Sequence, residues 1–74
     1  MRVHYDNEVD AIYIQLGNEQ PDGVIEISEG VHLDTTSDDQ IVGIEILHVS
    51  RKMDIHTILS YELDLGINPI RQVA

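Results

Sequence analysis

The residues best suited to chemistry are three carboxylates at alternate positions, Asp6, Glu8 and Asp10, in the stretch YDNEVDAIYIQL. Hard divalent cations bind several oxygen ligands at once, so a D-x-E-x-D run is a candidate cation site. The run lacks the glycine and the closing glutamate of an EF-hand loop. The interpretation that we favour is a turn between two strands, in which Asp6 caps a single helical turn through the Val9 amide and Asp10 accepts a hydrogen bond from another amide.

Histidines supply a second set of possible ligands. His4 and His32 fall in alternating segments, next to Val3 and Val31. With Asp34, these histidines would lie on one face of a sheet and ligate zinc if the strand register brought them together. No H-E-x-x-H motif supports this, and non-catalytic histidines are the alternative. We therefore expect no metal site and no cofactor, and the alternative is a metal site formed from the candidate ligands Asp6, Asp10, His4, His32 and Asp34.

Other catalytic chemistry has little support in the sequence. The chain contains no cysteine. No serine lies in a G-x-S-x-G turn, and no glycine-rich phosphate loop is present. Two carboxylates acting as acid and base need a cleft that separates their environments, and a chain of this size would form one only between subunits. We therefore expect no catalytic residues within a single chain.

Alternation of apolar and polar residues over the first 47 positions predicts short strands that must position these side chains. The expected strands are residues 2–5, 11–16, 24–27, 31–34 and 41–47. Short connections favour antiparallel pairing of consecutive strands. Tyr13 is expected on the face opposite Ile12 and Ile14. Residues Ile41–Leu47 are apolar on both faces except at Glu45, so we expect a helix or another subunit over the second face.

Beyond Leu47 the periodicity becomes helical. It predicts one helix from about Arg51 to about Tyr61, with Ser50 and Asp54 as possible N-caps. Its apolar face would consist of Ile55, Ile58 and Leu59. Glu62–Ile67 is either the end of this helix or an additional strand. The predicted fold class is α+β, an antiparallel β-meander of four to five short strands followed by one C-terminal helix, in a single small domain over residues 1–74.

Composition narrows the possible partners. Fourteen acidic residues oppose four Lys and Arg, for a formal charge of -10. Such a surface repels nucleic acids and anionic lipids and attracts a basic protein or a cation, although charge alone also serves solubility. A cysteine-free chain of 74 residues has a small core, so we expect a homodimer or higher homo-oligomer. Without a signal-type apolar segment, a cytoplasmic location is expected.

Two blocks of the sequence resemble a known family. YDNEVDAIYIQL is similar to Y-D-x-E-x-D-A-x-Y-I-x-L, and EGVHLDTTSDDQIVGIEILHVSRKM is similar to E-G-v-x-l-D-x-d-x-x-G-x-I-V-G-I-E-I-L-x-A-S-k. Together they resemble a bacterial family of domains of unknown function, number twenty-two eighty-three, over about residues 1–53. Asn7 replaces a frequent proline, and the usual glycine is missing from TTSDDQ. The resemblance implies a small β-rich fold, no established activity and no catalytic residues. Because some relatives are encoded beside small toxin-like proteins, it also suggests an antitoxin-like role.

Two functional hypotheses follow. The first is a small acidic, non-enzymatic interaction module that forms homo-oligomers and binds a basic protein partner. The alternative is a metal-dependent enzyme, with Asp6, Asp10, His4 and His32 near a subunit interface. Elemental analysis separates them, because the enzyme requires stoichiometric zinc or manganese in the purified protein.

Overall fold

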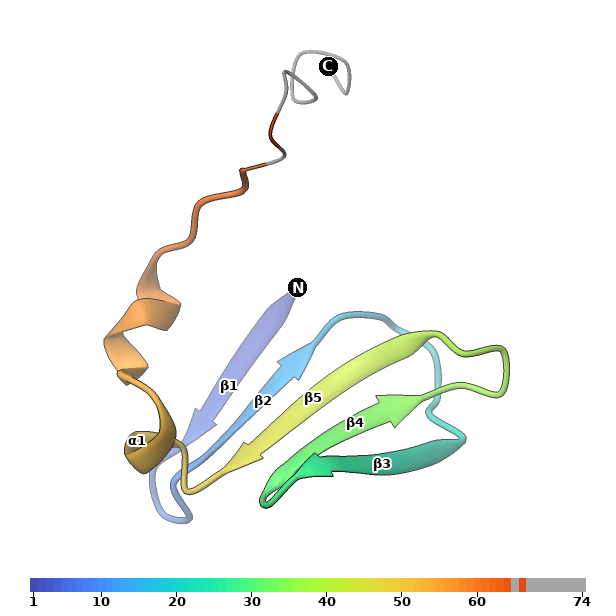
Figure 1. Ribbon diagram of the computed structural model, residues 1–74, viewed down its shortest axis with the longest axis horizontal. Coiled ribbons are helices and arrows are strands. Elements are labelled where there is room, and N and C mark those ends of the chain that lie inside the picture. Colours follow the sequence, from blue (N-terminus) through green and yellow to red (C-terminus); the bar gives the residue numbers. More distant parts are fainter. Residues whose placement is uncertain (65, 67–74) are drawn as a thin grey trace.

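A single antiparallel sheet dominates the computed structural model, which describes residues 1–64 and 66 (Figure 1). Its strands are β1 (Arg2–Asp6), β2 (Ala11–Gln15), β3 (Gly23–Ser28), β4 (Val31–Thr35) and β5 (Ile41–Leu47). Two short helical segments follow, α1 (Val49–Lys52) and the 3-10 helix η1 (Ile55–Leu59). The five strands predicted from alternation are confirmed. Within the described part of the chain, every helix is too short to cross a membrane.

The strands lie in the order β1-β2-β5-β4-β3. Consecutive strands pair as predicted in β1–β2, β3–β4 and β4–β5, and every pair is antiparallel. The order departs from consecutive pairing at one step, because β2 pairs with β5 and not with β3. The strand richest in apolar residues thus occupies the centre of the sheet, where neighbours shield it on both sides. β1 and β3 are the edge strands.

The register divides the side chains between two faces. The apolar face consists of Val3, Ile14, Ile44, Leu33 and Ile25 in one row and Tyr5, Ile12, Ile46 and Val31 in the next. The polar face consists of Arg2, Gln15, Gly43, Asp34 and Val24 in one row and His4, Tyr13, Glu45, His32 and Glu26 in the next. The prediction that Tyr13 lies opposite Ile12 and Ile14 is therefore confirmed.

The predicted single helix over residues 51–61 is wrong. The chain is extended at Met53 and Asp54, which separates α1 from η1. Asp54 acts as a cap, as predicted, by accepting a hydrogen bond from the His56 amide at 3.0 Å. A cap at this point starts a new turn instead of continuing the old one. The β-branched residues Ile55, Thr57 and Ile58 further weaken a regular helix.

The start and end of this region also differ from expectation. α1 begins after His48, whose backbone is left-handed with φ of 52°, and Ser50 lies inside the helix instead of capping it. Within Glu62–Ile67, residues 62–64 are neither helix nor strand, while Leu65 and Ile67 lie outside the described residues.

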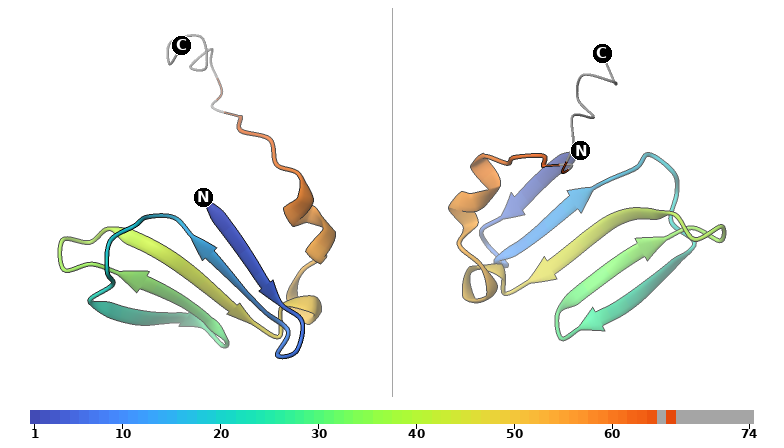
Figure 2. Two further views of the ribbon diagram at one scale, coloured as in Figure 1. Left: turned by 180° about the vertical axis from the view of Figure 1, so that it is seen from behind. Right: turned by 45° about the horizontal axis from the view of Figure 1, so that its top comes forward.

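The hydrophobic core is small. The buried apolar residues of the described chain are Ile12, Val42 and Val49. Figures 1 and 2 show α1 and η1 beside the β1 end of the sheet, with neither face covered by a helix. The second face of β5 is instead shielded at Gly43 by the Tyr13 side chain of the same chain. The face left open is the apolar one.

Candidate functional site

Asp10 connects the turn between β1 and β2 to the start of α1. Its carboxylate accepts hydrogen bonds from the Ser50 hydroxyl at 2.6 Å, the Ser50 amide at 3.3 Å and the Tyr5 hydroxyl at 3.1 Å. Its carbonyl accepts a further bond from the Val49 amide at 3.0 Å. We call Tyr5, Asp10, Val49 and Ser50 the Asp10 latch. Asp10 thus satisfies amides at the start of α1 from a distant point in the sequence.

The latch also changes the acidity of two of its members. The Ser50 hydroxyl stabilises the ionised carboxylate and lowers the pKa of Asp10 below its usual value. Partial desolvation, together with the hydrogen bond to Asp10, raises the pKa of Tyr5. These contacts explain why the sequence places a carboxylate at position 10 without invoking a metal.

Asp6 has a local role. Its carboxylate accepts a hydrogen bond from the Glu8 amide at 3.0 Å, two residues along the chain. Asp6 therefore caps the turn as predicted, but through the Glu8 amide and not through the predicted Val9 amide. Asp6 and Asp10 each serve protein donors, and among residues 1–64 and 66 no group of three His, Asp or Glu side chains is placed to hold a metal ion.

The remaining metal candidates are distributed over the polar face. His4 on β1 and His32 on β4 share a row, but Tyr13 and Glu45 stand between them. Three strand spacings separate the two histidines, roughly 14 Å, which is too far for one ion. The Asp34 carboxylate accepts a hydrogen bond from the Tyr13 hydroxyl. The structure therefore does not bring His4, His32 and Asp34 together.

On the polar face, the Tyr13 side chain of β2 reaches across β5 to a residue of β4. Its ring crosses β5 over Gly43, and its hydroxyl donates to Asp34 Oδ2 at 2.8 Å. A side chain at position 43 would overlap the Tyr13 ring. The hydrogen bond to the Asp34 carboxylate raises the pKa of Tyr13. The sequence signal for this link is Gly43, a glycine within an otherwise apolar strand, and alternation alone does not reveal it.

His32 forms a second cross-strand arrangement beside this link. Its Nε2 lies 3.2 Å from Glu26 Oε2 on β3, and its Nδ1 lies 3.6 Å from Glu45 Oε1 on β5. Each ring nitrogen thus faces a carboxylate from a different strand. The two carboxylates approach opposite sides of the ring, so one ion cannot bind both carboxylates and the imidazole together. The arrangement is suited to holding strands in register.

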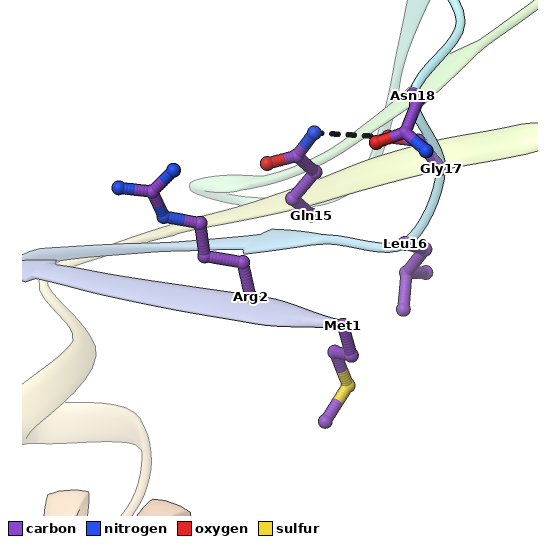
Figure 3. A pocket seen from close by; sticks show the side chains of 6 residues that line it. All are labelled: Met1, Arg2, Gln15, Leu16, Gly17 and Asn18. Carbon is purple, nitrogen blue, oxygen red and sulfur yellow. Dashed lines mark hydrogen bonds between the residues drawn. The ribbon is translucent and has the colours of Figure 1, made fainter.

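A hollow at the end of the β1–β2 hairpin offers little chemistry. Its volume is about 330 Å³, and it is lined by Met1, Arg2, Gln15, Leu16, Gly17 and Asn18 (Figure 3). The Gln15 amide donates to the Gly17 carbonyl at 3.1 Å, as Figure 3 shows. No carboxylate or imidazole lines the hollow to act as acid or base with the Arg2 guanidinium.

A groove of different character lies between β1 and η1. Its volume is about 520 Å³, and it is lined by Val3, Tyr5, Ile55, His56, Ile58 and Leu59. Val3 and Tyr5 belong to the apolar face, so η1 forms a wall along one margin of that face. The groove and the apolar face together form a continuous apolar surface, which is suited to binding another chain.

The chain is thus a small single-sheet β-domain, completed by a latched helical turn. It belongs to the family described as "Protein of unknown function (DUF2283)", whose model matches residues 2–50. The matched segment spans all five strands and ends at Ser50, which completes the Asp10 latch. Comparison with curated proteins and with solved structures gave no match.

Proposed function

We propose that the protein is a homo-oligomeric interaction module whose apolar face is covered by a second copy of the chain. The observation that carries this proposal is the exposure of that face. Ile25 is 53% exposed and Tyr5 is 37% exposed, and most of the other residues of the face are half-buried, although Ile12 is buried. Burying an Ile or Leu side chain stabilises by about 1.5–3 kcal/mol, which is large beside a total stability of about 5 kcal/mol for a small domain.

A second copy fits this face for reasons of charge and shape. The apolar face has no Asp, Glu, Lys or Arg, so two copies can meet there without bringing together the charges of a chain with net -10. Sheets pack face to face at a separation of about 10 Å. A two-fold dimer would also place the η1 wall of each copy beside the partner, where Leu59, 82% exposed, is available for contact.

The surfaces outside such a dimer remain acidic. They favour encounter with a basic protein and disfavour acidic partners, because charge complementarity acts on association rate and specificity. The family resemblance suggests an antitoxin-like role, in which this acidic surface binds a basic toxin-like protein.

Sedimentation velocity at micromolar concentration tests self-association directly. We expect a dimer or larger species, and a stable 8.4 kDa monomer would overturn the proposal. Elemental analysis of the same sample tests the alternative enzyme. Stoichiometric zinc or manganese would favour the metal-dependent enzyme over the interaction module.

A further inference from the structure

The two edges of the sheet differ in how they are covered. β1 lies beside η1 and shares the apolar groove with it. β3 pairs with β4 on one side, and all six of its residues are exposed. Three of these are large aliphatic residues, Val24, Ile25 and Ile27, with exposed fractions of 63%, 53% and 57%. An exposed apolar edge strand is a template for pairing with another chain.

Backbone geometry identifies which peptide groups of β3 face outward. The Leu47 amide donates to the Gly30 carbonyl at 2.8 Å, so Gly30 bonds to β5. Hydrogen bonding alternates along an antiparallel strand, so Leu33 directs its peptide groups to β3 and pairs with Ile25. The N–H and C=O groups of Val24 and Glu26, on either side of Ile25, then point away from the sheet. These groups are available to an additional strand.

The charge along β3 is negative, and the Lys52 ammonium bonds to the Glu29 carbonyl in the turn that follows the strand. β3, β4 and the loop 36–40 contain no Lys or Arg. The Glu26 side chain, on the polar face of this edge strand, is 58% exposed, and its carboxylate lies 3.2 Å from His32 on the neighbouring strand β4. Asp22, just before β3, adds another carboxylate to this part of the sheet and accepts a hydrogen bond from the Ser37 amide, in the loop after β4, at 2.8 Å.

We infer that the β3 edge binds an extended, basic segment of a partner protein, which pairs with β3 as an additional strand of the sheet. Main-chain hydrogen bonds to Val24 and Glu26 would supply affinity, and side chains would supply selectivity. On the polar face the segment would place Lys or Arg beside Glu26. On the opposite face it would place aliphatic residues beside Ile25. The ligand is therefore an alternating basic and aliphatic sequence.

A second copy of the chain suits this edge less well. Two antiparallel β3 strands would bring the Glu26 and Asp22 carboxylates of both copies onto one face along a shared edge. Like charges across paired strands destabilise the pairing. The inference rests on the proposed function in one respect, the basic charge of the partner. It is independent of self-association through the apolar face.

A peptide titration tests the inference with the full chain. The probe is a fluorescent peptide of alternating Lys and Val with blocked ends, followed by anisotropy. We expect saturable binding that weakens with added salt, and no binding of the Glu and Val counterpart. The same Lys and Val peptide with every amide N-methylated keeps its charge but loses its donors. Equal binding of the methylated peptide, or no binding of the Lys and Val peptide, would overturn the inference.

Substitutions in β3 locate the site. Val24→Pro removes an outward N–H and leaves the neighbouring bonds to β4, while Val24→Thr keeps the amide. We expect Val24→Pro to bind the peptide about tenfold more weakly, and Val24→Thr to bind as the parent does. Equal binding by both variants would contradict the edge site. Sedimentation of Val24→Pro distinguishes the two proposals, because its self-association should persist. Loss of self-association would assign the edge to a second copy instead.

Discussion

The two faces of the sheet are built on the same strands but completed in different ways. On the polar face, Tyr13 reaches across Gly43 to Asp34, and His32 lies between carboxylates from both neighbouring strands. These side chains find their partners within one chain. On the apolar face, Ile25 remains 53% exposed, and both helical segments lie to one side. These polar groups therefore contact one another within a single chain, whereas part of the apolar face stays accessible, which is the basis of the proposed self-association.

The largest effect should come from placing a charge on the apolar face. Ile44 lies on the central strand, between Ile14 and Leu33. We expect Ile44→Lys to abolish self-association and to lower the free energy of unfolding by about 3 kcal/mol, because a charge is costly where apolar surface is buried. Sedimentation and urea unfolding measure the two effects. Val24→Lys, an equivalent change on the polar face, should preserve self-association. Equal behaviour of the two variants would contradict the contrast between the faces.

A smaller effect should come from displacing the Tyr13 ring. Gly43→Ala would overlap the ring, break its bond to Asp34 and destabilise the protein by about 1–3 kcal/mol. In a Tyr13→Ala background the same substitution should cost little, which a double-mutant cycle by urea unfolding would measure. Gly17→Ala is the control, because the added methyl makes an ordinary contact of 3.4 Å with Val42. Additive losses in the cycle would argue against direct contact.

The Asp10 latch should make stability depend on pH. Because the pKa of Asp10 is lowered in the folded protein, its contribution is present above its ordinary pKa and is lost as pH falls through the folded value. Asp10→Asn keeps a residue that tolerates the left-handed backbone, where φ is 55°. We expect the variant to be less stable at neutral pH, with the difference narrowing in acid. Urea unfolding across that range measures it, and a constant difference would contradict an ionised latch.

The smallest effect should be spectroscopic. The Asp34 carboxylate raises the pKa of Tyr13, so Asp34→Asn should lower the pH at which Tyr13 ionises. The stability associated with this shift is present below the ordinary tyrosine pKa and is lost as the pH rises through the folded value. Ultraviolet absorbance titration follows the phenolate, and Tyr13→Phe identifies its signal. Asp39→Asn removes a charge from a loop and serves as the control. An unchanged titration in Asp34→Asn would mean that Tyr13 does not use that carboxylate.

The sequence predicted the strands well because the alternation of apolar and polar residues and the lengths of the connections point to the same local structure. Alternation located all five strands and assigned Tyr13 to its face. The neighbour of β2 was not predictable from connection length, since seven residues at 16–22 permit a short turn and also a longer path past β5 to β3. Pairing of β2 with β5 depends on apolar burial across distant parts of the chain.

The helical region and the candidate site show other limits of sequence reasoning. Ser50 and Asp54 are both residue types that cap helices well. The helical spacing of Ile55, Ile58 and Leu59 therefore predicted one continuous helix where the structure has two short segments. Geometry showed that Ser50 serves the latch and that Asp54 starts η1. The metal candidates have suitable side chains, but the strand order separates His4 from His32. Residue type alone could not supply that order.

The central position of β5 also determines the order in which the strands can pair during synthesis and folding. β1–β2 and β3–β4 are local hairpins that can begin to pair as soon as their own residues leave the ribosome, but β5 alone joins them. Until Leu47 has emerged, β2 and β4 each keep an unpaired inner edge. The Asp10–Ser50 contact must form later still. Long-range pairing of this kind slows folding, so closure of the latch should mark the last step of sheet assembly, with both inner edges vulnerable to other chains until then.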